Sequence, residues 1–118
     1  MKFMILVKAT RDSEAGKMPP ESLFAEMGAY HEELAKAGIL VDASGLQRSA
    51  KGWRIKYNGK QRSFVDGPFA ETKELVAGYT VINVKSREEA IEWTKRFLAV
   101  TGEGESEVRQ IFEGPTSS

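Results

Sequence analysis

Residues 79–98 read YTVINVKSREEAIEWTKRFL, a strand pattern that runs directly into a helix pattern. β-Branched and aromatic residues alternate with others from Tyr79 to Val84, which predicts a strand. Ser86 and Glu89 have the spacing of a capping box, in which the serine is the N-cap and the glutamate is the third helical residue. The helix that follows would bury one apolar face, which contains Ala90, Ile91, Phe97 and Leu98. The stretch therefore predicts one strand-to-helix unit of a packed domain.

The N-terminal third of the chain has the same order. Residues 3–7, Phe-Met-Ile-Leu-Val, are an unbroken apolar run between two lysines, which is typical of a strand covered on both faces. Residues 9–20 contain turn-forming residues and end in two prolines, so we expect a loop there. A helix is predicted from Pro20 to Ala37, with Gly38 at its C-terminal cap. Apolar residues recur along it at spacings of three and four, at Leu23, Met27, Tyr30, Leu34 and Ala37.

A β-hairpin is predicted in the middle of the chain. Two alternating runs, residues 53–57 and 60–65, flank Asn58-Gly59, which is a strong short-range signal for a two-residue hairpin loop. Such a loop would pair Tyr57 with Lys60, Ile55 with Arg62 and Trp53 with Phe64. The same alternation would place Asp66 on the face that carries Trp53 and Phe64.

Two further strands complete the pattern, one that begins at residues 39–41 and one over Val108–Phe112. The chain order is then β-α-β, a hairpin, and β-α-β again. This order predicts an α+β fold of the ferredoxin-like split βαβ type with an inserted β-hairpin, in which an antiparallel sheet packs on two helices. Because two helices cover only one face of the sheet, we expect a second copy on the other face, as in a homodimer of the dimeric α/β-barrel type. A length of 118 residues fits a single domain over residues 1–118.

Composition excludes several classes of partner. Seventeen basic and seventeen acidic residues cancel, so no overall field draws the chain to nucleic acid or to an anionic membrane, and we expect neither as a partner. The chain has no cysteine, which removes disulfides and thiolate metal sites and fits a cytoplasmic protein. A metal would need carboxylates and His31, and no ligand spacing indicates a metal site. We expect no cofactor.

Residues 66–74, Asp-Gly-Pro-Phe-Ala-Glu-Thr-Lys-Glu, followed by Ala77-Gly78-Tyr79, resemble the signature of the YCII-related proteins called the DGPF family. The resemblance extends to the opening strand and to residues 86–93. It implies a ferredoxin-like fold that forms dimers, with a pocket in each subunit between the sheet, the helix ends and the DGPF segment.

The resemblance implies no single activity. One branch of the wider YCII superfamily removes hydrogen chloride from an aromatic substrate, and some members are similar to proteins encoded beside extracytoplasmic-function sigma factors. A histidine paired with an aspartate is the proposed catalytic couple of the superfamily. The histidine of that couple lies near the start of the first helix, where this chain has Pro20 and Glu21.

Asp66 and His31 are the candidate catalytic residues. The amide two residues after Asp66 belongs to Pro68, which has no N–H, so the simplest aspartate turn is not available and the carboxylate needs another partner or a ligand. A structural turn role is the alternative. His31, the only histidine, borders the apolar stripe of its helix and is a candidate general base if a carboxylate such as Asp66 orients it. The alternative is a partly exposed surface histidine.

Five residues are candidate binding groups, namely Trp53, Phe69, Glu71, Lys73 and Tyr79. Glu71 and Lys73 could equally belong to an exposed charge run, and Tyr79 could be a core residue. Basic residues also cluster at the hairpin, which fits either a solvated strand edge or a contact for an anion or an acidic partner.

The sequence thus supports two functions. The first is a cofactor-free small-molecule enzyme that carries out proton transfer or elimination in a pocket by the DGPF segment, with Asp66 as acid or base and His31 as its assistant. The alternative is a non-enzymatic metabolite-binding or regulatory protein, for example one associated with an extracytoplasmic-function sigma factor.

Overall fold

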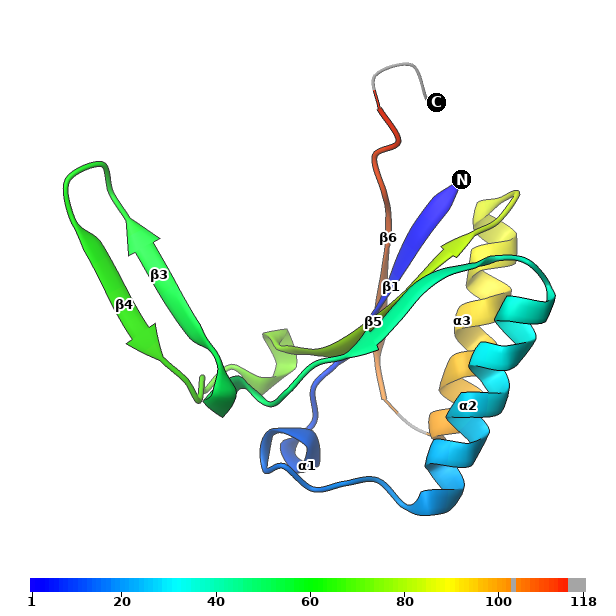
Figure 1. Cartoon of the computed structure of the whole chain (residues 1–118), viewed down its shortest axis with the longest axis horizontal. Coiled ribbons are helices and arrows are strands. Elements are labelled where there is room, and N and C mark those ends of the chain that lie inside the picture. The colour runs from blue at the N-terminus through cyan, green and yellow to red at the C-terminus, as the bar shows by residue number, and fades with distance from the viewer. Residues whose placement is uncertain (103, 115–118) are drawn as a thin grey trace.

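The computed structural model describes residues 1–102 and 104–114 and has an α+β fold (Figure 1). Four antiparallel strands form the main sheet in the order β2-β5-β1-β6, and two further strands form a separate hairpin. The main strands are β1 (Lys2–Lys8), β2 (Leu40–Gly45), β5 (Val76–Asn83) and β6 (Ser106–Gln110), and the hairpin strands are β3 (Trp53–Tyr57) and β4 (Arg62–Asp66). The helices are α1 (Arg11–Glu14), α2 (Glu21–Lys36) and α3 (Arg87–Thr101), and short 3-10 turns lie at Ser49–Lys51 and Thr72–Glu74.

The two long helices begin and end close to the predicted residues. At the start of α3 the Ser86 hydroxyl accepts a hydrogen bond from the Glu89 N–H at 3.1 Å, as a capping box requires. The Glu89 carboxylate accepts from the Lys85 N–H at 3.0 Å, one residue before the predicted partner. After α2, Gly38 has a φ of 74°, a conformation that glycine adopts without strain and that ends the helix.

The core lies between the sheet and these two helices, which lie side by side on one face of it (Figure 1). Leu34 of α2 and Ile82 of β5 are fully buried there, and Phe97 joins them from α3. Because successive strand residues point to opposite faces, Phe3 and Ile5 of β1 enter this core and their neighbours do not. Within one chain β1 is therefore covered by helices on one face only.

We call the other face of the main sheet the helix-free face. Its side chains include Met4, Leu6, Tyr79 and Val81, by alternation with the core residues of β1 and β5. Met4 and Leu6 are half-buried although no helix covers them.

Two predictions about chain ends and loops were wrong. Residues 9–20 include the helix α1 rather than loop alone, because Thr10 and Ser13 cap each other: the Thr10 hydroxyl accepts from the Ser13 N–H at 3.1 Å and the Ser13 hydroxyl oxygen accepts from the Thr10 N–H at 2.8 Å. Strand β6 covers Ser106–Gln110 rather than Val108–Phe112, because its pairing with β1 ends where Phe3 meets Gln110. Phe112 is 99% exposed.

The predicted hairpin exists, but its register was wrong by two residues. Tyr57 pairs with Arg62 and Trp53 with Asp66, so residues 58–61 form the connection. The reason is Asn58, whose side-chain carbonyl accepts from the N–H groups of Lys60 and Gln61 at 3.0 and 2.8 Å. A shift of two keeps every side chain on its face, so Asp66 does share a face with the rings of Trp53 and Phe64, which stack with centroids 6.1 Å apart.

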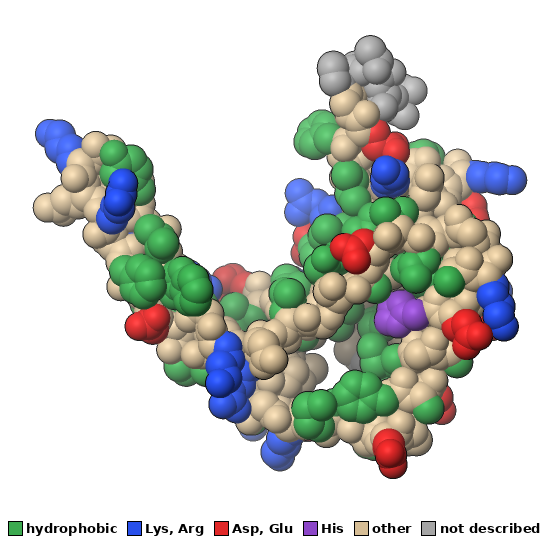
Figure 2. All heavy atoms as spheres, viewed as in Figure 1, with side chains coloured by type: hydrophobic (Ala, Val, Ile, Leu, Met, Phe, Trp, Pro, Cys, Tyr) green, Lys and Arg blue, Asp and Glu red, His purple; other side chains and the backbone are tan. Residues whose placement is uncertain are grey.

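The hairpin, residues 53–66, projects from the main sheet as an arm (Figure 1). Its strands pair only with each other, and every residue of both strands is exposed. Figure 2 shows an open gap between this arm and the rest of the molecule. The hairpin arm is thus joined to the body at its base alone.

Tyr30 gives a stability prediction for the core. It is 3% exposed, its hydroxyl donates to the Trp93 carbonyl at 2.9 Å, and burial raises its pKa from 10.0 to about 12. We expect Tyr30→Phe to lower the free energy of unfolding by about 1 kcal/mol, because the carbonyl loses its partner. Since the folded pKa is raised, the stabilisation by the neutral hydroxyl is complete below pH 10.0 and is lost as the pH rises toward about 12.

Alkaline absorbance titration measures this effect. A late ionisation step should appear as the pH rises toward about 12, and Tyr30→Phe should remove that step. Identical titration curves above pH 10.0 for the wild type and Tyr30→Phe, apart from the loss of one tyrosine's amplitude at the start of the transition, would contradict the burial of the Tyr30 hydroxyl.

Candidate functional site

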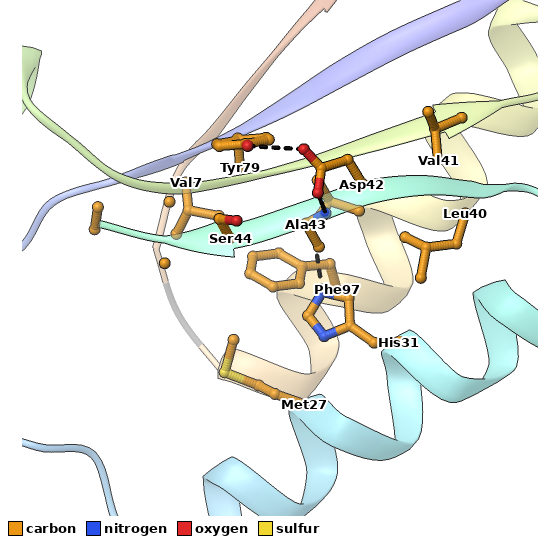
Figure 3. Close-up of a pocket in the computed structure, with 14 residues that line it drawn as sticks. Val7, Met27, His31, Leu40, Val41, Asp42, Ala43, Ser44, Tyr79 and Phe97 are labelled. Carbon is orange, nitrogen blue, oxygen red and sulfur yellow. Dashed lines mark hydrogen bonds between the residues drawn. The ribbon is translucent and has the colours of Figure 1, made fainter. Parts of the chain in front are cut away.

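A cavity of about 600 Å³ lies between α2 and the β2 edge of the main sheet (Figure 3). Most of its wall is apolar, with Met27 from α2, Leu40 from β2 and Phe97 from α3. Five lining residues bring polar side-chain atoms, namely His31, Asp42, Ser44, Tyr79 and Thr80. An apolar cavity of this size with a few polar groups is typical of a site for a small organic molecule.

His31 reaches this cavity from α2, where it borders the apolar stripe as the sequence indicated. The ring is half-buried and lies edge-on to Tyr30, with centroids 5.5 Å apart. Its Nε2 lies 3.3 Å from the Thr80 hydroxyl, which is held on the buried side of β5. The Nδ1 atom has no hydrogen-bond partner within residues 1–102 and 104–114. Thr80 therefore orients the imidazole and leaves one nitrogen for a ligand.

Asp42 and Tyr79 form a second polar group at the cavity. The Tyr79 hydroxyl donates to Asp42 Oδ2 at 2.9 Å, and Asp42 Oδ1 accepts from the Ala43 N–H at 2.8 Å. The register of β2 shifts between Leu40 and Asp42, which sets the side chain of Asp42 toward Tyr79. Figure 3 shows this pair on the opposite side of β2 from His31. The cavity therefore reaches around the free edge of the sheet.

The structure separates the predicted site residues into two groups. His31 and Tyr79 line the cavity, whereas Asp66 and the other four predicted residues do not. Asp66 lies exposed on the hairpin arm, and its carboxylate has no hydrogen-bond or ion-pair partner in the part of the chain that the structure describes. A single chain thus does not bring Asp66 to His31.

Thr80 and Asp42 were missed by the sequence analysis. Asp42 carried a usable signal, because a lone acidic residue directly follows the apolar residues 39–41. Thr80 carried none, since it is one of several β-branched residues in its strand and only the fold places it beside His31.

The DGPF segment anchors the hairpin arm by its backbone. The Phe69 N–H donates to the Ser49 hydroxyl at 3.0 Å, and the Gly67 N–H donates to the Gly52 carbonyl at 3.0 Å. Ser49 in turn donates to Glu14 of α1 from its hydroxyl and, at 2.9 Å, from its N–H. Position 67 requires glycine because the backbone passes close to Ser49: a Cβ there would lie 1.8 Å from the Ser49 carbonyl oxygen.

Side chains of the same segment hold the arm as well. The guanidinium of Arg54 in β3 lies 3.8 Å from the ring centroid of Phe69 and 3.4 Å from the Glu71 carboxylate. Lys73 is exposed in the neighbouring 3-10 turn. In a single chain Phe69 and Glu71 thus contact the arm and not the cavity.

The family model of the YCII-related domain matches residues 1–114, nearly the whole chain. This chain belongs to the YCII-related family. This chain is also similar to an uncharacterised protein of Rhizobium meliloti. The two are 27% identical over 96 residues, which are 80% of this chain and 77% of that protein. A solved structure, 5-chloro-2-hydroxyhydroquinone dehydrochlorinase from Burkholderia phenoliruptrix in complex with 2,5-dihydroxybenzoquinone, has a TM-score of 0.55 at 15% identity and covers 100% of both chains. At that identity the likeness shows a shared α+β fold.

Two features are absent from residues 1–102 and 104–114 of this YCII-related chain. None of the helices there has the length and apolar character needed to cross a membrane. No three potential ligands among histidine, aspartate and glutamate come together there as a metal site would require.

Proposed function

We propose that this YCII-related protein binds a small organic molecule in the cavity beside His31 and that the imidazole transfers a proton to or from it. The observation that carries the proposal is the His31 ring, which Thr80 holds at 3.3 Å while its Nδ1 is left for a ligand. A histidine titrates near neutral pH, so it can act as acid or base in such a position.

The chemistry that fits is proton abstraction, followed by elimination where the ligand has a leaving group. Neutral His31 takes a proton from a hydroxyl or an activated C–H, and the electron pair of that bond stays on the ligand. If a neighbouring carbon bears chloride, the pair forms the new double bond and chloride leaves. The imidazolium then returns its proton to water, so the protein is unchanged and no redox partner is needed.

A hydroxylated aromatic or quinone-like ligand suits this cavity best. Met27, Leu40 and Phe97 offer apolar surface to a ring, and the Ser44 and Tyr79 hydroxyls offer hydrogen bonds to ring oxygens. The dehydrochlorinase of the same fold is in complex with 2,5-dihydroxybenzoquinone, a ligand of this class. That relative supports the choice of ligand class for this chain.

Asp66 is the second candidate acid–base group. Since it does not line the cavity of its own chain, it would have to act on a cavity of another copy.

Binding without turnover would favour the metabolite-binding alternative, in which the same cavity holds a ligand and His31 only recognises it.

Gly45 offers a direct test, because it lines the cavity and a Cβ there would meet nothing within 4 Å. We expect Gly45→Val to fill cavity space without disturbing the fold. Calorimetric titration with 2,5-dihydroxybenzoquinone should show binding to the wild type and an affinity about tenfold lower or worse for the variant. Gly28→Val is the matched control, because Gly28 is exposed on α2, does not line the cavity and also has open space at its Cβ. Equal affinities for wild type and Gly45→Val, or no wild-type binding, would contradict the proposal.

A further inference from the structure

A second cavity, of about 270 Å³, lies next to the His31 cavity, near the C-terminal end of α3. Figure 3 shows Val7 and Met27 at the end of the His31 cavity away from Leu40 and Val41. Both residues belong to a set of four that line the two cavities alike, namely Val7, Met27, Ala77 and Phe97. These side chains form a shared wall, so a ligand beside His31 also lies beside the second cavity.

The second cavity is mostly apolar and its charges cancel. Leu23 of α2 and Leu98 of α3 add apolar surface to the shared side chains. Among the described residues that line it, Lys8 and Glu105 bring opposite charges, and Lys8 also pairs with the Glu107 carboxylate at 3.6 Å. An uncharged group therefore fits this space better than an ion, which would lose its water against an apolar wall.

Ser106 of β6 brings a polar group that the fold leaves unused. It pairs with Val7 of β1, so both side chains point to the face of the sheet that the helices cover. The Ser106 hydroxyl is buried and has no hydrogen-bond partner within residues 1–102 and 104–114. Such groups are rare because a buried hydroxyl without a partner is costly. Since Ser106 lines the cavity, one change of its side-chain rotamer directs the hydroxyl into it.

The other hydroxyls of the described residues around this cavity are engaged within the protein. The Thr10 hydroxyl accepts from the Ser13 N–H at 3.1 Å, and the Ser13 hydroxyl donates to the Thr10 carbonyl at 3.1 Å. The Thr101 hydroxyl donates to the Leu98 carbonyl at 3.1 Å. Ser106 is therefore the hydroxyl that is left for a ligand.

We propose that the second cavity takes a substituent of the ligand, so that the ligand is a hydroxylated ring with a short, uncharged alkyl chain that ends in an oxygen. This inference rests on the proposed function, because it places the ring beside His31. The alkyl part of the chain contacts Leu23 and Leu98, and its terminal oxygen pairs with the Ser106 hydroxyl. Met27 lies in the shared wall, and its unbranched, flexible side chain moves to let the chain pass.

Three ring compounds test the second cavity: 2,5-dihydroxybenzoquinone and its derivatives with a butyl or a terminal hydroxypropyl chain on the ring. The two chains have equal numbers of non-hydrogen atoms and differ only in ending with a methyl or a hydroxyl group. In calorimetric titration we expect the wild type to bind the hydroxypropyl compound about fivefold more tightly than the butyl compound. Ser106→Ala should lose or reverse this preference, because the hydroxyl of the chain is then buried without a partner. Each ratio is measured within one variant, so a general loss of stability does not imitate the effect.

Ser44→Ala is the matched control, because Ser44 lines the first cavity and not the second. It should weaken the binding of both derivatives alike and keep the preference. Three results would overturn the second cavity as a ligand site while the proposed function stands: wild-type binding of 2,5-dihydroxybenzoquinone with both derivatives about tenfold weaker or worse, equal wild-type affinities for the two derivatives, or an unchanged preference in Ser106→Ala. A wild type that binds none of the three compounds would refute the proposed function and this inference with it.

Discussion

Gly67→Ala should be among the most damaging single substitutions in this chain, with a loss of about 3 kcal/mol in the free energy of unfolding. A Cβ at this position would lie 1.8 Å from the Ser49 carbonyl oxygen and 2.6 Å from its carbonyl carbon. Both atoms are backbone, so no side-chain rotation relieves the clash. The segment would have to move away from Ser49 and give up the hydrogen bond from the Phe69 N–H.

Gly52→Ala is the matched control for this prediction. A Cβ at Gly52 would approach the same Ser49 oxygen, but at 3.7 Å, which is ordinary contact. We expect its stability to stay within about 0.5 kcal/mol of the wild type in urea denaturation. Gly67→Ala and Gly52→Ala proteins of equal stability would show that the DGPF backbone does not pack against Ser49 as described.

His31→Gln should abolish proton transfer while the cavity keeps its shape. The glutamine amide can still hydrogen-bond to Thr80, but it cannot accept a proton near neutral pH. We expect turnover to fall by about 10²- to 10⁴-fold, the usual contribution of a general acid or base. The rate of chloride release from 5-chloro-2-hydroxyhydroquinone measures this turnover. That compound is the one in the name of the dehydrochlorinase that shares the fold.

Asp66→Asn belongs in the same assay, because it separates the two candidate groups. If only His31→Gln loses turnover, His31 alone carries the proton. Equal losses in both variants, with the fold and the oligomeric state unchanged, would make Asp66 a partner of His31 in the reaction. A loss in Asp66→Asn with none in His31→Gln would contradict the role given to His31.

Local patterns were enough to predict the scaffold of this protein. Strand β1, helices α2 and α3 and the hairpin depend on apolar spacing, caps and Asn58-Gly59, all of which lie within a few residues of each other. The faces of the arm were also predictable, because they depend only on alternation. The length of the hairpin loop was not, since the Asn58 side chain closes it by bonds to Lys60 and Gln61.

The site could be predicted only in part, because its contacts join distant residues. His31 was a candidate on its own chemistry, yet Thr80, its partner, is 49 residues away and depends on how α2 packs on β5. Likewise the conspicuous DGPF segment suggested a pocket, whereas its contacts reach back to Ser49 and Glu14 and hold the arm. No short-range pattern reports such contacts.

One NMR titration tests the central claim, that His31 belongs to a ligand site. Because the chain has a single histidine, its ring protons give one assignable set of resonances once any affinity tag is removed. The account predicts that 2,5-dihydroxybenzoquinone shifts these resonances in a saturable way in the wild type and not in Gly45→Val. Resonances that stay in place while the ligand saturates the protein would place the binding site elsewhere and contradict the account.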